Sequence, residues 1–238
     1  MSDFDQSSQS SSGSVAVSYA VDIVFVIDVT GSMQPVIDNV KRSALSFHDD
    51  LRKVMAEKDK SISNLRVKVV AFRDFLDDES DALEQSPFFT LPDERSGFDS
   101  FVHSLEAGGG GDMPESGLEG LGVAIRSDWE RGMDRRRHLV VLFTDAPAHP
   151  LEHSASLASI PAGTPRSMNE LFDAWEGDGQ SGGMEHSAKR LLLYAPDMEP
   201  WNSISEDWQN TLHFPSQAGD GLDDYTFDEI LNQIAASV

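Results

Sequence analysis

The sequence contains no cysteine. Disulfides, thiolate-bound zinc, iron–sulfur clusters and a cysteine nucleophile are therefore excluded. Long hydrophobic runs are also missing, because no stretch reaches the roughly 18 consecutive apolar residues that a membrane span requires. The first residues, "MSDFDQSSQSSSGS", have neither the basic residues nor the apolar core of a signal peptide. We therefore expect a soluble, cytoplasmic protein.

Positive charge is scarce. Lysine and arginine total 18 against 41 aspartates and glutamates, and the formal net charge is -23. Nucleic-acid backbones and anionic lipid surfaces both attract basic proteins, so we expect neither nucleic acid nor a membrane as a partner. The basic run "RRRH" at 135–138 precedes an apolar segment and is interpreted as the solvated entry of a strand.

What the sequence does contain is an alternation of apolar runs and helical periodicities. Residues 1–18 are Ser-rich and aperiodic, which predicts a disordered leader, and residues 19–238 are long enough for one α/β domain. The run "VDIVFVID" is typical of a central strand covered on both faces. Apolar runs predict strands at 21–28, 65–75, 86–91, 138–143, 190–196 and 211–215, and three- and four-residue apolar spacing predicts helices at 34–58, 97–107, 116–131, 168–175 and 226–237.

The order of these elements predicts the architecture. The link between the second and third strands is too short for a parallel crossover, which favours an antiparallel hairpin. The other strands are separated by helices, as in parallel sheets. We therefore predict a Rossmann-like three-layer α/β/α sandwich with a mostly parallel sheet and one antiparallel edge strand.

Counting chain directions places three polar loops at one edge of this sheet. If the strand at 21–28 runs upward, it ends at the top, and the next helix and strand bring the chain down and up again. The hairpin and the helix that follows it then bring "GGGGDMPE", at 108–115, to the top. The strand at 138–143 also ends there, at "TDAP". Open α/β sheets place ligands at this carboxyl edge.

The residues in these loops predict a site for a divalent cation. Asp28, Thr30 and Ser32 alternate along the first loop, so their oxygens can point at one centre, and Glu115 and Asp145 add carboxylates from the other two loops. Mg²⁺ and Mn²⁺ prefer such oxygen ligands and usually keep several waters. Two of the first three ligands are neutral hydroxyls, so the metal would attract a further anionic oxygen from outside.

At these residues the sequence resembles the von Willebrand factor A (vWA) family, which includes the integrin I and I-like domains. "DVTGSM" is similar to the metal-ion-dependent adhesion site (MIDAS) motif of the family, Asp-x-Ser/Thr-x-Ser, supplied here by Asp28, Thr30 and Ser32. "VVAFRDF" also matches a strand pattern common in the family. The resemblance extends over roughly residues 20–238 and implies the vWA fold and a Mg²⁺ cofactor, with Mn²⁺ or Ca²⁺ as alternatives.

The resemblance also implies roles for the other two loops. "GGGGDMPES" is similar to the second metal loop of the bacterial and integrin-like branch, which makes Glu115 a ligand and Asp112 an additional or water-mediated one. "FTDAPAH" is similar to the third loop, whose aspartate, here Asp145, holds the metal through water. Many family members have a threonine ligand in the second loop, so whether Asp112 or Glu115 is the direct ligand stays open.

The function implied by the resemblance is docking. We expect a stand-alone, non-enzymatic interaction module in which the bound cation receives an Asp or Glu side chain of another protein. The expected setting is a bacterial multi-protein system, with an AAA+ ATPase, a kinase or another protein of the same operon as partner. A metal-assisted hydrolase using the same cation is the alternative.

Simpler interpretations of the same residues exist. Asp28 or Ser32 can cap a helix, although capping accounts for only one of them. The glycine run can be a flexible linker, and Asp145 can be an ordinary turn residue. The acidic residues at 77–81 are interpreted as a solvated hairpin tip.

Overall fold

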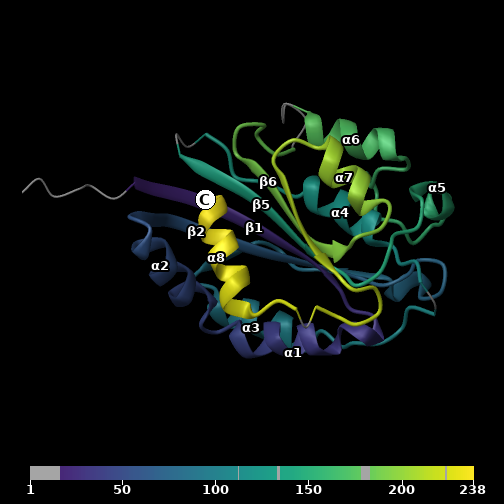
Figure 1. Cartoon of the computed structure of the whole chain (residues 1–238), viewed down its shortest axis with the longest axis horizontal. Helices are drawn as coiled ribbons and strands as arrows, with labels where there is room; N and C mark the ends of the chain where they lie inside the picture. The colour runs from purple at the N-terminus through teal and green to yellow at the C-terminus, as the bar shows by residue number, and fades with distance from the viewer. Residues whose placement is uncertain (1–16, 112, 133–134, 178–182, 223) are drawn as a thin grey trace, which may run out of the picture.

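The computed structural model describes residues 17–111, 113–132, 135–177, 183–222 and 224–238. Its centre is a seven-stranded sheet in the order β3-β2-β1-β5-β6-β7, in which β4 also pairs with β2 (Figure 1). The predicted leader at 1–18 falls mostly outside the described residues, and β1 begins two residues before the predicted boundary. The strands are β1 (Val17–Asp28), β2 (Lys60–Phe72), β3 (Leu83–Gln85), β4 (Phe89–Leu91), β5 (Arg136–Phe143), β6 (Lys189–Pro196) and β7 (Thr211–Ser216).

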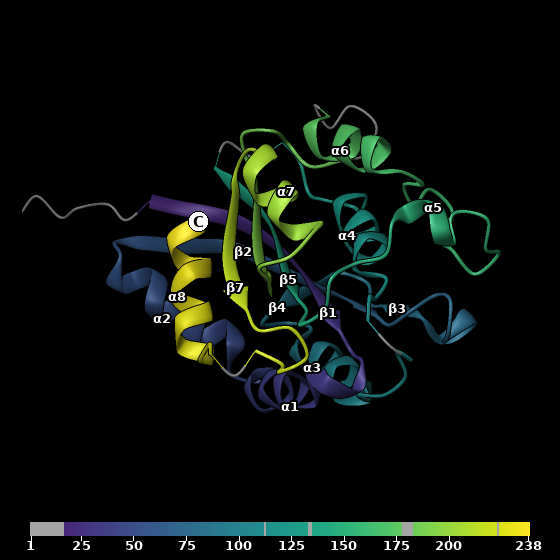
Figure 2. The same ribbon diagram turned by 45° about the vertical axis from the view of Figure 1, so that its right-hand side comes forward.

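Helices cover both faces of this sheet, so the predicted three-layer α/β/α fold is confirmed. One layer contains α1, α2, α3 and α8, and the other contains α4, α6 and α7 (Figures 1 and 2). The helices are α1 (Gln34–Ser43), α2 (Phe47–Glu57), α3 (Arg95–Ser104), α4 (Gly117–Ile125), α5 (Leu151–Ser154), α6 (Met168–Glu176), α7 (Trp201–Asp207) and α8 (Phe227–Ser237), with short 3-10 turns at η1 (Gly31–Met33) and η2 (Glu79–Asp81).

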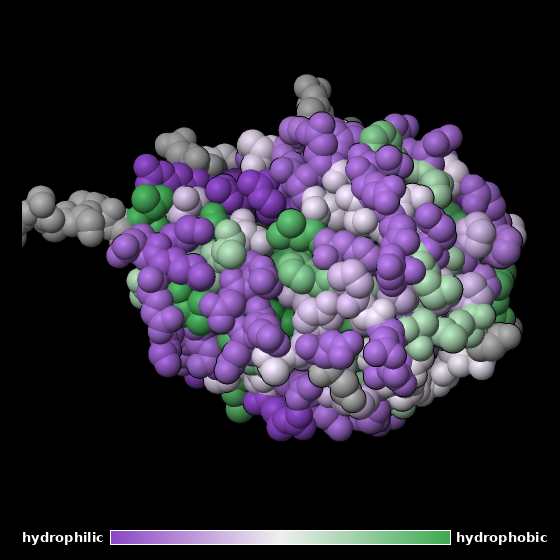
Figure 3. Space-filling view, in the orientation of Figure 1, coloured by the Kyte–Doolittle hydropathy of each residue, from purple (hydrophilic) through white to green (hydrophobic). Residues whose placement is uncertain are grey.

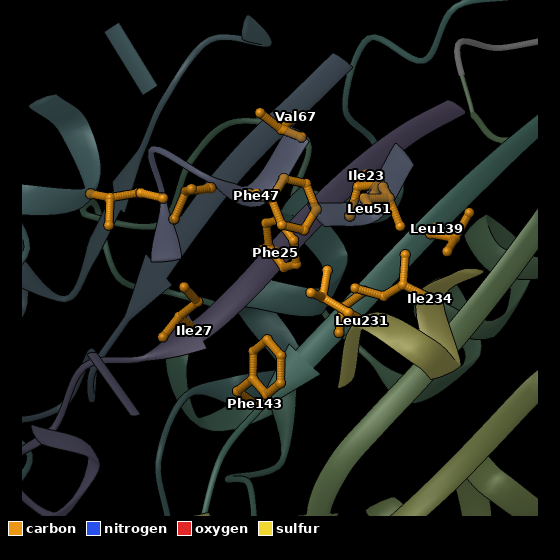
Figure 4. Packing of buried hydrophobic residues seen from close by; sticks show 14 of the residues in the cluster. Ile23, Phe25, Ile27, Phe47, Leu51, Val67, Leu139, Phe143, Leu231 and Ile234 are labelled. Atoms are coloured by element: carbon orange, nitrogen blue, oxygen red, sulfur yellow. The ribbon is translucent and has the colours of Figure 1, made fainter. Parts of the chain in front are cut away.

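The apolar run of β1 is continuous because both of its faces are buried. Ile23, Phe25 and Ile27 point into the core beneath α2 and α8 (Figure 4), while Val24 and Val26 point into the second core beneath α4. Successive strand side chains alternate between the two faces, so a strand between two helical layers needs apolar residues at every position.

The chain differs from the predicted element boundaries at two helices. The helix predicted at 34–58 is two helices, because the chain makes a turn at Ala44–Ser46 that leaves Leu45 52% exposed. The helix predicted at 116–131 ends at Ile125, where the indole Nε1 of Trp129 donates to the last carbonyl groups of α4. The short helices α5 and α7 were not predicted, because they contain too few residues for a helical period to be recognised.

The antiparallel edge is present but consists of two short strands. β3 and β4 both pair with β2, and Ser86 lies between them. Its hydroxyl oxygen accepts a hydrogen bond from the backbone of Val69 at 2.9 Å, in place of a ladder carbonyl. A side chain therefore continues the pairing where the edge strand is interrupted.

The strand order also fixes where a ligand can bind. β1 lies between β2 and β5, and the chain leaves β1 toward β2 before it returns on the other side to form β5. Reversals of this kind open a crevice at the carboxyl ends of the two strands. Within the described residues, no helix has the length and apolar character needed to cross a membrane.

The final helix, α8, begins with a reciprocal cap. The Thr226 hydroxyl accepts from the backbone of Glu229, and the Glu229 carboxylate accepts from the backbone of Thr226. Replacing Thr226 with alanine should lower the free energy of unfolding by about 1 kcal/mol in urea denaturation. Thr226→Ser, which keeps the hydroxyl, should stay within a few tenths of the parent. Equal losses in both variants would show that the hydroxyl does not act as a cap.

Candidate metal site

The first and third candidate loops leave the sheet at its topological switch point. β1 ends at Asp28 and β5 ends one residue before Thr144, on adjacent strands. The glycine-rich loop joins them, because the backbone N–H of Gly108 donates to the carbonyl of Val29 at 2.9 Å. The three loops therefore meet at one edge of the sheet, as the sequence predicted.

Asp28 organises the first loop. Its carboxylate is fully buried, and Oδ1 accepts from the backbone N–H of Thr30 at 2.9 Å and from the Thr30 hydroxyl at 2.6 Å. Oδ2 accepts from the hydroxyl of Thr144 at 2.7 Å. Thr144 was not identified from the sequence, although it directly precedes the predicted ligand Asp145. Neither η1 nor α1 has a side-chain cap, so Asp28 is not the N-cap of either.

Ser32 and Asp145 come together from the first and third loops. The exposed Ser32 hydroxyl donates to Oδ1 of Asp145 at 3.0 Å. The backbone N–H of Gly221, in the connection between β7 and α8, donates to Oδ2 at 2.8 Å. Asp145 is 1% exposed, and its two hydrogen bonds connect the third loop with the first loop and with the segment before α8. The alternative of an ordinary turn residue does not account for these contacts.

Glu115 approaches the same point from the second loop. Its backbone N–H donates to Pro147 and its carbonyl accepts from His149, which ties the second loop to the third. The Glu115 side chain is 4% exposed, and its Oε2 has no hydrogen-bond partner among the described residues. A buried carboxylate oxygen without a partner is costly unless something outside the chain binds it.

Gly110 shows how close the second loop comes to the first. A Cβ atom added to Gly110 would lie 2.5 Å from Oε1 of Glu115 and 2.5 Å from Cγ2 of Thr30. Gly110 has φ +67°, in the left-handed region that favours glycine. This close approach needs a residue without a side chain, so the glycine run is part of the site and not a linker.

Arg73 and Asp78 hold the glycine loop in place, and neither was identified as a site residue from the sequence. The Arg73 guanidinium donates to the carbonyls of Gly108 and Glu106 at 2.8 Å each. Oδ2 of Asp78 accepts from the backbone N–H of Gly110 at 2.9 Å. Asp78 belongs to the acidic stretch that was interpreted as a solvated tip, and this contact corrects that interpretation.

Two carboxyl groups of the site have raised pKa values. Burial raises the pKa of Asp28 to about 6, and the nearby charge of Asp145 adds to this, although the hydrogen bonds of Thr30 and Thr144 oppose it. Burial also raises the pKa of Glu115 to about 9, together with the charges of Asp28 and three further aspartates. A cation at this position would favour the ionised form of both carboxyls.

The residues fit a hard divalent cation, but only as a mixed set. Among the described residues, no three His, Asp or Glu side chains form a metal-binding group by themselves. A site here would therefore need the Thr30 and Ser32 hydroxyls, and Oε2 of Glu115, which has no partner among the described residues, is the candidate for an anionic ligand. Asp112, the other candidate in the second loop, lies outside the described residues.

Comparisons with known proteins agree with this fold. The family model described as von Willebrand factor A domain matches residues 22–164. Alpha-protein kinase vwkA from Dictyostelium discoideum is 27% identical over 154 residues, which is 65% of this chain but only 23% of that protein. The pilus adhesin SpaC from Lactobacillus rhamnosus GG has a similar fold in two crystal structures, with TM-scores of 0.51 and 0.50 at 13% identity, and the likeness covers 92% of this chain and 30% of the adhesin.

Proposed function

Because this chain belongs to the von Willebrand factor A domain family, we propose that it is a non-enzymatic protein-interaction module with a MIDAS-type site. In this proposal the site binds Mg²⁺, and the cation receives an Asp or Glu side chain from a partner protein. The main support is Glu115, a buried carboxylate that lies beside the hydroxyl-bearing first loop and whose Oε2 has no hydrogen-bond partner in the described part of the chain.

The hydrogen bonds support two different roles for the residues of this site, metal ligand and hydrogen-bond acceptor. A neutral hydroxyl can bind a cation through a lone pair only if its proton points elsewhere. Thr30 donates its hydroxyl proton to Asp28, and Ser32 donates its proton to Asp145. We therefore assign Thr30, Ser32 and Glu115 as the residues that would hold the metal, and Asp28 and Asp145 as the acceptors that orient the hydroxyls.

This arrangement favours docking over hydrolysis. Both carboxylate oxygens of Asp28 and both of Asp145 accept hydrogen bonds, so neither side chain offers an unengaged oxygen as a general base for a metal-bound water. The remaining carboxylate, Glu115, is assigned in this proposal to the cation itself. When bound, the cation would supply an electrophilic centre with positions open to an external oxygen. We expect generic phosphoester and peptide substrates to remain intact in the presence of Mg²⁺.

Exposed apolar side chains near the site suit a protein partner. Met113 is 51% exposed two residues before Glu115, and Leu76 is 44% exposed with its backbone N–H on Asp74. Methionine and other apolar residues beside a polar centre are typical of protein interfaces. The similarity to the Dictyostelium kinase covers only 23% of that protein, so a segment similar to this chain occurs there in one polypeptide with a much longer remainder. We therefore keep a kinase, together with an AAA+ ATPase, among the partner classes proposed for a multi-protein system.

The net charge of -23 restricts the partner further. At physiological salt the Debye length is about 8 Å, so the overall charge slows the approach of an anionic protein while the metal dominates at contact distance. We therefore propose a partner that presents one carboxylate from a neutral or basic surface. Loss of such a desolvated charge typically weakens binding strongly.

Affinity capture tests this docking mode. Immobilised protein should retain its partner from a native lysate in Mg²⁺ and release it in EDTA, because the cation forms the contact. Ser32→Ala should retain little in either buffer, while Ser46→Ala, at an exposed serine outside the site, should behave like the parent. Capture that is equal in Mg²⁺ and EDTA would contradict metal-mediated docking and would point to another surface.

The pH dependence of metal binding tests the role of Glu115. Its pKa is raised from 4.5 to about 9, so the metal-free folded protein keeps a proton that the unfolded chain has released between those values. The stability of the metal-free protein therefore falls as pH rises through this window, and Mg²⁺ must displace the same proton. The rise in melting temperature caused by Mg²⁺ should grow between about pH 6 and about pH 8.5.

Glu115→Gln is the control for this experiment, because glutamine has no proton to lose in that range. Its response to Mg²⁺, followed by differential scanning fluorimetry, should be smaller and should no longer grow above about pH 7, where Asp28, with its pKa of about 6, is already mostly ionised. A parent response that does not change with pH would remove Glu115 from the proposed ligand set.

A further inference from the structure

Three basic side chains gather at the edge of the sheet opposite the candidate metal site. Lys60 begins β2, and Arg137 and Arg190 are the second residues of β5 and β6. Strand pairing aligns Arg137 with Val21 and Arg190 with Leu139, whose side chains belong to the core beneath α8. The three cations therefore lie on the same face of the sheet as this core, at the starts of the strands.

These side chains line an open pocket of about 460 Å³. Tyr19, Asn210 and Thr211 contribute to its walls together with residues 236–238, and among the described residues no acidic side chain lines it. The C-terminal end of α8 lies beside the starts of β1 and β2 in both ribbon views (Figures 1 and 2). Hydrophilic side chains gather in the same region of the surface (Figure 3).

No ion pair with a carboxylate is formed by these cations among the described residues, although Val238, which carries the terminal carboxylate, is part of the pocket lining. Arg137 and Arg190 donate to backbone carbonyls, and Lys60 donates to the carbonyl of Ala235 at 3.3 Å. Burial first, and then the charge of Arg137, lower the pKa of both Lys60 and Arg190.

Two polar groups of the residues that line the pocket lack a hydrogen-bond partner among the described residues. They are Nε of Arg137 and the hydroxyl of Thr211, and both are buried. Lys60 has a structural role that explains its position, because its ammonium donates to a carbonyl near the C-terminal end of α8. This role does not account for the two arginines, whose observed donations go to strand and loop carbonyls instead.

We propose that this pocket binds the phosphoryl group of a small molecule. Two guanidinium groups, an ammonium and a hydroxyl suit the oxygens of a dianionic phosphate, and arginine favours such groups because its planar fork donates two parallel hydrogen bonds. A single carboxylate would leave two of the three charges unpaired. A long nucleic acid would be repelled by the net charge of -23, whereas a small phosphate ester fits within the pocket.

Calorimetric titration of the full chain with inorganic phosphate tests this proposal. EDTA in the buffer separates the result from the candidate metal site, and chloride keeps the ionic strength constant. One phosphate should bind per chain, and Arg137→Gln and Arg190→Gln should each weaken binding by at least about tenfold, because each removes charged hydrogen bonds. Arg126→Gln, at an exposed arginine outside the pocket, should bind like the parent.

Two further arms identify the source of the phosphoryl group. Glycerol phosphate should bind at least as tightly as inorganic phosphate, and a phosphoserine peptide should bind no tighter. Absence of binding, equal binding by both arginine variants and the parent, or preference for the peptide would each overturn the proposal. Both variants should melt near the parent's temperature in chloride, because the relief of charge repulsion offsets the loss of the hydrogen bonds that each arginine donates to backbone carbonyls. The two variants at different strands also guard against a folding defect in one of them.

Discussion

Asp28→Asn is expected to lose Mg²⁺ affinity by about a hundredfold while the metal-free protein stays folded, because groups that orient metal ligands typically contribute this much. Asp28 orients the Thr30 hydroxyl and supplies a fully buried negative charge. The amide oxygen of asparagine can still accept from Thr30, and Thr144 can accept from the amide nitrogen. Only the charge is lost.

The stability of this variant should move in the opposite direction. The pKa of Asp28 is raised to about 6, so at neutral pH its ionised form destabilises the metal-free fold. In EDTA the variant should melt at the same temperature as the parent or higher, whereas in Mg²⁺ the parent should melt higher. Such a reversal in the order of the two melting temperatures is expected of a site whose buried charge favours metal binding but destabilises the metal-free fold.

Calorimetry with Mg²⁺ and melting curves in Mg²⁺ and in EDTA measure both effects. Asp93→Ala, an exposed aspartate in the turn before α3, serves as the charge-matched control and should bind one Mg²⁺ like the parent. If Asp28→Asn binds Mg²⁺ as tightly as Asp93→Ala, the assignment of the site is wrong. If both fail to bind, the parent has no such site and the proposed function fails with it.

The architecture was predictable because its signals are local. The unbroken apolar run of β1 implied burial on both faces, and the short link before β3 implied an antiparallel edge. Chain direction then placed Asp28, Glu115 and Asp145 at one edge of the sheet. The structure brings Thr30 beside Asp28 and Ser32 beside Asp145, although Ser32 lies in the 3-10 turn η1 and not on the extended loop that the alternate spacing assumed.

The supporting contacts were not predictable, because they join segments that are far apart in the sequence. Thr144 meets Asp28 across 116 residues, and Gly221 meets Asp145 across 76. Arg73 was visible only as part of a strand pattern, yet it holds the glycine loop through backbone carbonyls. Backbone groups carry no sequence signal, so these partners become evident only when the loops are in place.

The position of the glycine loop leads to the second large effect. Gly110→Ala should weaken Mg²⁺ binding by at least about tenfold, because the displaced loop would no longer hold Glu115 next to Thr30. The left-handed backbone at φ +67° disfavours any L side chain, and this alone costs about 1 to 2 kcal/mol. The added methyl group would also overlap Glu115 and Thr30, each only 2.5 Å away.

Gly108→Ala provides a matched control in the same loop. A Cβ at Gly108 meets no atom within 4 Å, and its backbone contacts with Val29 and Arg73 do not involve a side chain. This variant should bind Mg²⁺ like the parent, whereas Gly110→Ala should bind weakly and unfold at a lower urea concentration. Titration calorimetry on both variants gives the comparison. Equal affinities would mean that the loop can move without displacing the metal ligands. The packing of Gly110 would then not be what holds Glu115 against Thr30.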